Sequence, residues 1–334
     1  MKILLVCERS GGHIFPAMAF AGNFLARGVD RRDIIFFITG GKFSEQIAKE
    51  GFVVVGKHFQ SRNLLFEMVW RFFEAGGILK RVRPDRVLGF GGRDSVFLLM
   101  SAVLLGKKTA IYEPNLTFGK ANRFLSGFVG KVLRGTKVGV PLRENIRRLD
   151  KAGVRAKLGL GPGPLILCFG GSQGASFVNR VFLQTAAKLG PGGQVIHLTG
   201  SRQYLEIFQV YNTMGITSLV KDFYYAMEEL YSAADVVVCR AGASALAEAN
   251  FYGLPAVLIP HPAAGGHQKD NAFYFQDQGA AFVFTEAGFS QDEFDQAVLS
   301  LVNDEKLRAE MSANMAKIKF AVPYEEFVKR DLGW

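Results

Sequence analysis

The chain of 334 residues contains only three cysteines, and none of them is spaced like a metal-binding or redox motif. Cys7, Cys168 and Cys239 each end an apolar run typical of a strand, so we predict that they are small buried side chains. An odd number of isolated cysteines favours a reducing compartment, which we expect to be the cytoplasm. Glu8 and Arg9 end the first apolar run too early for a secretory signal peptide, so secretion is not expected.

Long apolar runs are scarce as well. The longest, Val96–Leu105, is shorter than the roughly 18–20 residues that a membrane-spanning helix needs, so no such helix is expected. The segment Leu64–Phe73 (LLFEMVWRFF) is nevertheless apolar almost all the way round a helix, with several cations close by. Such a segment is either deeply buried or lies in a membrane interface. Trp70 with flanking cations fits the interface, and core packing stays open as the alternative.

Several nucleotide-binding motifs are missing. The glycine turns contain no G-x-G-x-x-G, and no acid ends the second expected strand to bind a ribose, which argues against a nicotinamide dehydrogenase. The absence of G-x-x-x-x-G-K-[ST] removes the common ATPase class. No D-x-D pair is present to hold a divalent cation on a diphosphate, so we predict no metal site and no cofactor. A leaving diphosphate then needs backbone N–H groups, a helix end and arginine.

Two glycine-rich turns are present instead. Ser10–His13 and Gly170–Gly174 each follow an apolar run of strand type and precede an apolar helical run. Glycine lets the backbone approach a ligand closely, and the helix start presents N–H groups suited to a phosphate. The sequence therefore predicts two α/β halves, each with a turn that accepts an anion.

Strands and helices are expected to alternate throughout the chain. The expected strands are Ile3–Cys7, Ile34–Ile38, Phe52–Val55, Arg86–Gly89, Thr109–Tyr112, Lys137–Val140, Leu165–Phe169, Val195–Leu198, Thr217–Leu219, Val236–Cys239, Ala256–Ile259 and Ala281–Phe284. This alternation is typical of parallel sheets covered by helices on both faces. We predict an α/β protein with doubly wound domains at 1–140 and 164–317 and a linker at 141–163. Ligands of such domains lie beyond the carboxyl ends of the strands, so two facing domains would bind them in a cleft.

The net charge is +10, and residues 120–157 hold eleven Lys or Arg against only Glu144 and Asp150. A basic surface attracts nucleic acid, anionic lipid headgroups or pyrophosphate substrates, and it can also be merely solvated. The basic runs lack interleaved aromatic residues on which bases would stack, so we expect no nucleic-acid partner.

The densest group of candidate ligand-binding residues is Arg240–Glu248, directly after the expected strand Val236–Cys239. If a helix begins near Ser244, Glu248 lies one turn further on the same face, where its carboxylate could accept both hydroxyls of a ribose. The alternative is that Ser244 caps the helix and Glu248 lies on the surface. In Pro260–Asn271, His, Gln and Asn precede another helix; they suit sugar hydroxyls, or else serve as ordinary turn and cap residues.

Seven motifs occur in an order that resembles the MurG family of peptidoglycan N-acetylglucosaminyltransferases, in glycosyltransferase family 28. They are S-G-G-H-I-F-P-A (Ser10–Ala17), G-F-G-G (Gly89–Gly92), Y-E-P-N (Tyr112–Asn115), G-K-A-N-R (Gly119–Arg123), G-G-S-Q-G-A (Gly170–Ala175), C-R-A-G-A with Glu248, and H-Q-K-D-N-A (His267–Ala272). The resemblance implies a GT-B fold, in which two Rossmann-like domains face a cleft. It also implies a C-terminal helix at about 318–334 that packs back on the first domain.

The resemblance further implies an inverting transfer of GlcNAc from UDP-GlcNAc to the C4 hydroxyl of MurNAc in undecaprenyl-pyrophosphoryl-MurNAc-pentapeptide, which converts lipid I to lipid II. The enzyme is then a peripheral protein on the anionic cytoplasmic face of the plasma membrane. A related lipid glycosyltransferase acting on diacylglycerol, or a UDP-sugar epimerase, remains an alternative.

The same resemblance implies roles for individual residues. On the donor side, Tyr224 lies beside the uracil and Glu248 takes the ribose hydroxyls. The diphosphate is served by Ser172, by the helix start formed by Ala243, Ser244, Ala245, Leu246 and Ala247, and by Arg143. The GlcNAc hydroxyls are read by His267, Gln268 and Asn271. In the first domain, the acceptor pyrophosphate is held by Ser10, Gly11, Gly12, Gly91 and Gly92, while Asn115 approaches the transferred sugar and Asn122 belongs to the acceptor side.

Inversion requires a base on the acceptor hydroxyl, and His13 is the leading candidate because a helix start disfavours the imidazolium form. Glu113 is the second candidate, and a role for His13 in merely orienting a loop or phosphate is the alternative. The chain departs from the family where glycines are usual, at Glu8–Arg9, and also at Tyr112, Pro114, Gly139 and Arg93–Asp94. These departures lie mostly on the acceptor side.

Overall fold

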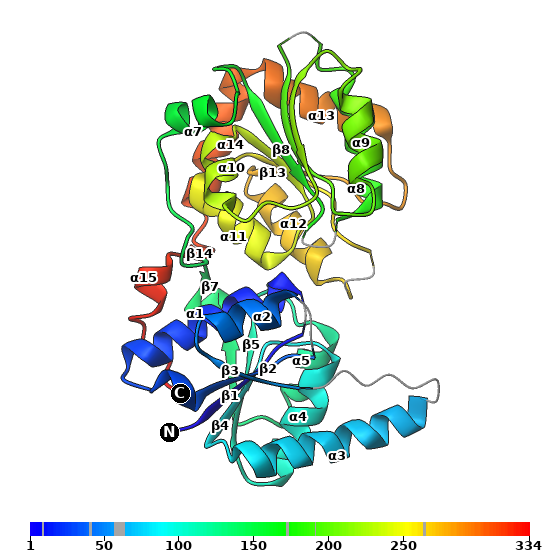
Figure 1. Cartoon of the computed structure of the whole chain (residues 1–334). Helices are drawn as coiled ribbons and strands as arrows, with labels where there is room; N and C mark the ends of the chain where they lie inside the picture. Colours follow the sequence, from blue (N-terminus) through cyan, green and yellow to red (C-terminus); the bar gives the residue numbers. More distant parts are fainter. Residues whose placement is uncertain (9, 40–41, 57–63, 172–173, 191, 263–264) are drawn as a thin grey trace. The chain divides into compact units, whose positions relative to one another are not determined.

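The computed structural model describes residues 1–8, 10–39, 42–56, 64–171, 174–190, 192–262 and 265–334 (Figure 1). The chain forms two compact units, the first made of 1–144 and 322–334 and the second of 145–321. Residues 145–163, which the sequence suggested as a linker, are thus part of the second unit.

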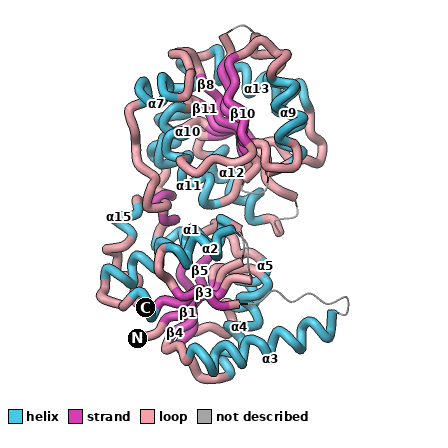
Figure 2. Tube along the Cα trace, in the orientation of Figure 1, coloured by secondary structure: helices cyan, strands magenta, loops and turns pink. Residues whose placement is uncertain are grey.

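The first unit is built on a parallel sheet of six strands in the order β3-β2-β1-β4-β5-β6. The strands are β1 (Ile3–Val6), β2 (Ile34–Phe37), β3 (Val53–Val55), β4 (Arg86–Gly89), β5 (Lys108–Glu113) and β6 (Lys131–Arg134). The main helices are α1 (Gly11–Ala26), α2 (Lys42–Lys49), α3 (Leu64–Val82), α4 (Arg93–Leu104) and α5 (Lys120–Leu125), and Figure 2 shows the sheet at the centre of the unit.

Both faces of this sheet are covered, which is why its central strands are continuous apolar runs. In β1, Ile3 and Leu5 pack with α1 and α2, whereas Leu4 and Val6 pack with α3 and α4. Cys7 is buried at the end of β1, and Cys168 and Cys239 are buried in the second unit. The prediction that the three cysteines are small buried side chains is therefore confirmed.

The expected strand at Lys137–Val140 is wrong. The chain forms β6 at Lys131–Arg134, then the short helix α6 (Gly135–Val138), and then the two-residue strand β7 (Val140–Pro141). The strand β6 was not predicted because this edge strand is short, buries only Leu133 and begins and ends with a basic residue. Gly139, with φ +80°, ends α6 in a conformation that favours glycine.

The last residues of the chain return to the first unit. Strand β14 (Ala321–Val322) pairs with β7, and the short helix α15 (Tyr324–Phe327) contacts α1. Asn23 of α1 donates from Nδ2 to the carbonyls of Phe327, Val328 and Arg330 at 2.9–3.0 Å. These bonds satisfy carbonyls that the end of α15 leaves without helical partners.

The second unit repeats the architecture, with a parallel sheet in the order β10-β9-β8-β11-β12-β13. Its strands are β8 (Leu165–Phe169), β9 (Gln194–Leu198), β10 (Thr217–Lys221), β11 (Val236–Cys239), β12 (Ala256–Leu258) and β13 (Ala281–Val283). Its helices are α7 (Lys151–Lys157), α8 (Ser176–Ala186), α9 (Tyr204–Tyr211), α10 (Met227–Ala233), α11 (Ala243–Tyr252), α12 (His267–Asp277), α13 (Gln291–Asn303) and α14 (Glu305–Lys317).

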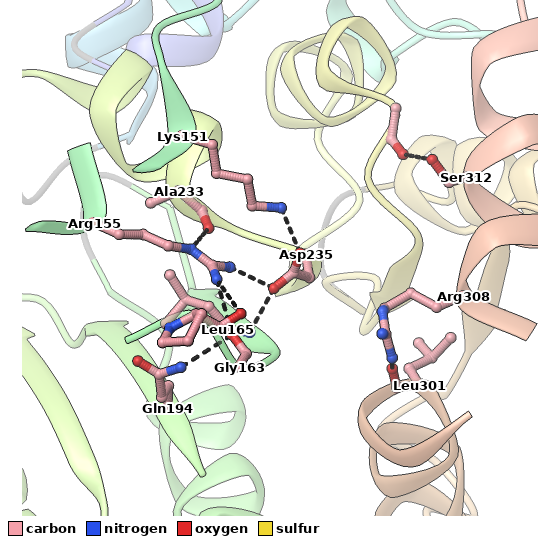
Figure 3. Close-up of polar contacts among 12 residues, drawn as sticks. Lys151, Arg155, Gly163, Leu165, Gln194, Ala233, Asp235, Leu301, Arg308 and Ser312 are labelled. Atoms are coloured by element: carbon pink, nitrogen blue, oxygen red, sulfur yellow. Dashed lines mark hydrogen bonds and ion pairs between the residues drawn. The ribbon is translucent and has the colours of Figure 1, made fainter. Parts of the chain in front are cut away.

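Helix α7 is fixed to the second unit by a partly buried carboxylate (Figure 3). Asp235 pairs with Lys151 and Arg155 at 2.5 Å each and accepts the N–H of Leu165 at 2.7 Å. Arg155 also donates to the carbonyl of Ala233 at 2.8 Å. Burial alone would raise the pKa of Asp235, but the hydrogen bonds from Lys151 and Leu165 and the two cations lower it. This network explains why the basic stretch around α7 is ordered against the sheet.

A second buried network lies around His197 in β9. Its Nδ1 is 3.1 Å from the hydroxyl of Tyr211, and its Nε2 is 3.2 Å from Oδ1 of Asn179. The amide oxygen of Asn179 can only accept, so Nε2 carries the proton and Nδ1 accepts from Tyr211. Burial lowers the pKa of His197 to about 3, and the ring is therefore neutral at physiological pH.

This lowered pKa predicts loss of stability in acid. The unfolded chain protonates His197 below about pH 6.5 and the folded chain only near pH 3, so stability is complete above pH 6.5 and falls as the pH decreases between these values. Between pH 7.5 and 4.5 we expect the free energy of unfolding of His197→Gln to decrease by about 2–3 kcal/mol less than that of wild type. Urea unfolding followed by circular dichroism measures this, and tryptophan fluorescence follows the first unit, which holds both Trp70 and Trp334. Equal pH dependence in the two proteins would contradict the prediction.

Candidate active site

The candidate residues gather where each sheet reverses its winding. In the first sheet the order changes direction between β1 and β4, and in the second between β8 and β11. Ser10, Gly91–Gly92, Gly170–Gly171 and Arg240–Gly242 lie in the segments that follow these four strands. In doubly wound sheets, ligands bind outside the carboxyl ends of the strands at this switch point.

In the first unit, the structure brings His13 and Asn122 to the turn at Gly91. Helix α1 begins at Gly11 with Ser10 as its N-cap, and Ser10 Oγ is 3.3 Å from Nδ1 of His13. A Cβ atom on Gly91 would lie 3.4 Å from His13 Nε2 and 3.6 Å from Asn122 Nδ2. With φ +93°, Gly91 adopts a backbone conformation that favours glycine.

Glu113 ends β5 and organises the loop that follows it. The carboxylate is 2 % exposed and accepts four hydrogen bonds. Oε1 accepts the backbone N–H and Nδ2 of Asn115 at 3.1 and 2.7 Å, and Oε2 accepts the N–H of Gly119 and Nδ2 of Asn122 at 3.0 Å. A carboxylate that accepts four hydrogen bonds is held in one place as a structural anchor, and this geometry suits a positioning role better than proton transfer.

Arg134 holds the same loop and was not singled out from the sequence. It stands opposite Glu113 in the neighbouring strand, donates to the carbonyl of Leu116, and lies over the ring of Phe118 at 4.3 Å. No signal in the sequence pointed to Arg134, because the strand that it ends, β6, was not among the expected strands. Arg143 lies elsewhere in the first unit, with its guanidinium over the ring of Phe15 on α1 at 4.7 Å.

In the second unit, α11 starts directly after the turn that ends β11. Its N-cap is Gly242, so the first turns of the helix contain Ala243, Ser244, Ala245, Leu246 and Ala247. Glu248 is 6 % exposed. The alternative in which Ser244 caps the helix and Glu248 lies on the surface is therefore wrong. A buried carboxylate one turn behind a helix start can accept hydroxyl groups while the helix start meets an anion.

The start of α12 is fastened to the same turn. Asn271 is fully buried and donates to the carbonyl of Ala241 at 3.2 Å. Gln268 accepts the N–H of His261 at 2.9 Å, and its Nε2 lies 4.0 Å from the position of a Cβ atom on Gly242. His267 is the first residue of α12. The three polar residues expected to read a sugar thus lie on a helix start beside the start of α11.

Arg240 and Glu286 support this arrangement. Arg240 Nη1 donates to the carbonyl of Ile259 at 3.1 Å, and Nη2 pairs with Glu286 at 2.7 Å. The pair fixes the backbone at the end of β12, from which the His267 loop departs.

Tyr224 lies in the loop after β10, and its hydroxyl donates to Glu229 at 2.8 Å. Burial, together with this hydrogen bond and the charge of Glu229, raises the pKa of Tyr224 to about 12. Ser172 lies outside the described residues.

Within the described part of the chain, no three His, Cys, Asp or Glu side chains are close enough to hold a metal ion. The same residues contain no helix that is both long and apolar enough to cross a bilayer.

Two doubly wound parallel sheets with glycine turns at their switch points are the architecture of the GT-B fold, to which many glycosyltransferases belong. The family description "Glycosyltransferase family 28 N-terminal domain" matches residues 3–134, and "Glycosyltransferase family 28 C-terminal domain" matches residues 165–326. The chain belongs to glycosyltransferase family 28 and is a glycosyltransferase.

Similar curated proteins agree with this assignment. A protein of Desulfotalea psychrophila is 32% identical and covers 95% of this chain and 92% of its own length. A protein of Halothermothrix orenii is also 32% identical, with 95% of each chain covered. Both are named UDP-N-acetylglucosamine–N-acetylmuramyl-(pentapeptide) pyrophosphoryl-undecaprenol N-acetylglucosamine transferase. The crystal structure of Acinetobacter baumannii MurG superposes with a TM-score of 0.76 at 25% identity, covering 98% of both chains.

Proposed function

We propose that the protein transfers GlcNAc from UDP-GlcNAc to the C4 hydroxyl of MurNAc in undecaprenyl-pyrophosphoryl-MurNAc-pentapeptide, with inversion at the anomeric carbon. The observation that carries this proposal is the similarity to transferases with that name over 95% of this chain and 92–95% of theirs. The second unit binds the donor and the first unit binds the acceptor.

The donor site lies at the carboxyl ends of β8 and β11. Glu248 accepts the ribose hydroxyls, the start of α11 meets the diphosphate, and His267, Gln268 and Asn271 bind the GlcNAc hydroxyls. The buried carboxylate of Glu248 and the fastening of Asn271 to Ala241 support these roles. Tyr224 flanks the uracil through its backbone, since its hydroxyl is engaged by Glu229.

The transfer is a single displacement. The C4 oxygen of the acceptor forms a bond to C1 of GlcNAc, the bond between C1 and the β-phosphate oxygen breaks, and UDP leaves with the electron pair. His13 removes the proton of the hydroxyl as it attacks. The start of α1 disfavours the imidazolium, so His13 enters the reaction neutral, and Ser10 Oγ orients its ring through Nδ1. Glu113 positions Asn115 and Asn122 beside the acceptor.

Release of UDP with and without acceptor tests the proposal. We expect release from UDP-GlcNAc only when undecaprenyl-pyrophosphoryl-MurNAc-pentapeptide is present, together with a GlcNAc-containing lipid product. Release of UDP from UDP-glucose with diacylglycerol, or consumption of UDP-GlcNAc without any acceptor, would contradict it and identify one of the two alternatives.

The first unit binds the surface of an anionic membrane through α3 and its neighbours. Helix α3 turns Glu67 and Arg71 inward, where both are buried and paired with each other, and Arg71 also pairs with Asp94. Trp70 and Phe73 are 46 % and 76 % exposed. A helix that buries an ion pair and exposes aromatic residues suits an apolar surrounding rather than water.

Helix α4 packs beside α3, and α5 packs beside α4, so both extend this surface (Figure 1). Its exposed apolar residues are Val69, Trp70, Phe72, Phe73, Leu104, Leu105, Phe124 and Phe128. Exposed basic residues near them in the chain are Lys80, Arg81, Arg83, Lys108, Lys120 and Arg123. Aromatic residues with flanking cations are typical of a surface that rests on anionic lipid headgroups.

Liposome flotation tests the membrane surface. We expect Trp70→Ser with Phe73→Ser to reduce binding to vesicles containing anionic lipid by about tenfold or more. The reason is that burial of each aromatic side chain in the lipid would stabilise binding by well over about 1 kcal/mol. The matched control is Leu205→Ser with Phe208→Ser, two exposed apolar residues on α9 of the second unit. Equal binding by wild type and the α3 variant would remove this surface from the proposal.

A further inference from the structure

The glycine turn before α4 is filled by a side chain of the protein itself. Glu8, which follows β1, accepts at Oε1 the backbone N–H of Arg93, the first residue of α4. Its carboxylate also lies against Gly92, the N-cap of α4, so closely that a Cβ atom there would overlap it. The carboxylate of Glu8 thus takes the place that a helix start offers to an anion.

The other charged side chains at this helix start pair with one another. Asp94 in the first turn pairs with Arg71, and Glu67 pairs with Arg71 at 2.9 Å and with Arg93 at 3.3 Å. Among the described residues of this cluster, three carboxylates therefore face two guanidinium groups. A phosphate placed here would meet excess negative charge as well as an occupied helix start.

The start of α1 differs from the start of α4 in its charge and in the space around it. Its first turn holds no acidic residue, and a Cβ atom on Gly12 would meet no described atom within 4 Å. Arg143 lies over Phe15, one turn further along the helix. This helix start is open and electropositive, so a diphosphate has a site in the first unit without the turn at Gly91–Gly92.

An acceptor atom without a partner lies beside the filled turn. Asn122 is 2 % exposed, and its Nδ2 donates to Tyr112 O and to Glu113 Oε2 at 3.0 Å. Its Oδ1 is buried and finds no hydrogen-bond partner among the described residues. This oxygen lies 3.8 Å from the position of a Cβ atom on Gly91. A buried amide oxygen requires a hydroxyl or N–H partner, and the oxygens of an ionised diphosphate cannot donate.

We propose that Glu8 is an internal anion that excludes phosphate from the Gly91–Gly92 turn, and that this turn receives a neutral hydrogen-bond donor of the acceptor at Asn122 Oδ1. The donor is a sugar hydroxyl or an amide N–H. The inference rests on the proposed function because it takes the acceptor to be a pyrophosphoryl sugar. It replaces the expectation that Gly91 and Gly92 hold the acceptor pyrophosphate and assigns the diphosphate to the start of α1.

Titration with inorganic pyrophosphate tests the role of Glu8. The full-length protein is saturated with UDP to fill the donor site, and pyrophosphate binding is measured by calorimetry. We expect Glu8→Ala to bind pyrophosphate at least about fivefold more tightly than wild type, because it opens a helix start to an anion. Glu8→Gln should bind pyrophosphate with an affinity between those of wild type and Glu8→Ala, since it loses the negative charge while its amide oxygen still fills the site and accepts from Arg93.

A matched control and a second variant complete the test. Asp304→Asn changes a carboxylate that caps α14 through Leu307 in the second unit, and it should leave pyrophosphate affinity unchanged. Glu8→Ser replaces Glu8→Ala if the alanine variant does not fold. The inference would be overturned if Glu8→Ala, or Glu8→Ser in its place, bound pyrophosphate within about twofold of the wild-type affinity. Glu8 would then be a helix cap only. The titration needs no turnover, so its failure is distinct from a failure to transfer GlcNAc.

Discussion

Replacing His13 with alanine is expected to lower the turnover of GlcNAc transfer by about a hundredfold to a thousandfold while leaving the affinity for UDP-GlcNAc within about twofold of wild type. The reason is that His13 belongs to the first unit, where its Nε2 faces the turn at Gly91, whereas the proposed donor site lies in the second unit. Loss of the base removes an interaction needed only in the transition state. Steady-state kinetics with saturating substrates and calorimetry with UDP-GlcNAc measure the two quantities.

His13→Gln separates proton transfer from orientation. Glutamine keeps a hydrogen-bonding side chain near Ser10 but cannot accept a proton at neutral pH, so it should be about as slow as alanine. Near-normal turnover of His13→Ala would contradict the assignment of the base. Near-normal turnover of His13→Gln alone would show that His13 orients the loop and that the proton goes elsewhere.

Replacing Glu248 with alanine is expected to give the opposite kinetic signature. A carboxylate that accepts two hydroxyls makes two charge-assisted hydrogen bonds, so its loss should weaken binding of UDP and UDP-GlcNAc by about a hundredfold or more. Turnover at saturating donor should fall by less than about tenfold, because the ribose does not change in the reaction. Calorimetry with UDP measures the first effect and initial rates the second.

A nucleotide lacking the 2′-hydroxyl makes this test specific. Wild type should bind 2′-deoxy-UDP more weakly than UDP by about tenfold or more, and Glu248→Ala should bind both equally, since the interaction that tells them apart is gone. Glu206→Gln, an exposed acid on α9, is the matched control and should behave as wild type. If Glu248→Ala still prefers UDP over 2′-deoxy-UDP, Glu248 does not bind the ribose.

The central strands of both sheets could be predicted from the sequence, because strands buried on both faces are continuous apolar runs such as Ile3–Val6 and Val236–Cys239. The edge strand β6 could not, because its buried residue Leu133 stands among basic neighbours. Glycine turns likewise located the starts of α1 and α11, since glycine marks places where the backbone must pass closely or take a positive φ.

Contacts between residues far apart in the chain explain what the sequence left open. Glu113 was the second candidate for the base after His13, and the loop donors Asn115, Gly119 and Asn122 around its carboxylate favour a positioning role instead. Arg71 of α3 points inward, together with Glu67, because it pairs with Asp94 on α4. Helical periodicity does not reveal this partner. Glu8 was recognised only as a departure from the family pattern, and its contact with Arg93 gives it a role.

The central claim is that the second unit holds the nucleotide sugar at the carboxyl ends of β8 and β11. A crystal structure of the protein with UDP-GlcNAc tests it most directly. The account predicts the ribose hydroxyls within hydrogen-bond distance of Glu248 and the diphosphate at the start of α11. A nucleotide bound in the first unit, or bound in the second unit away from Glu248, would contradict it.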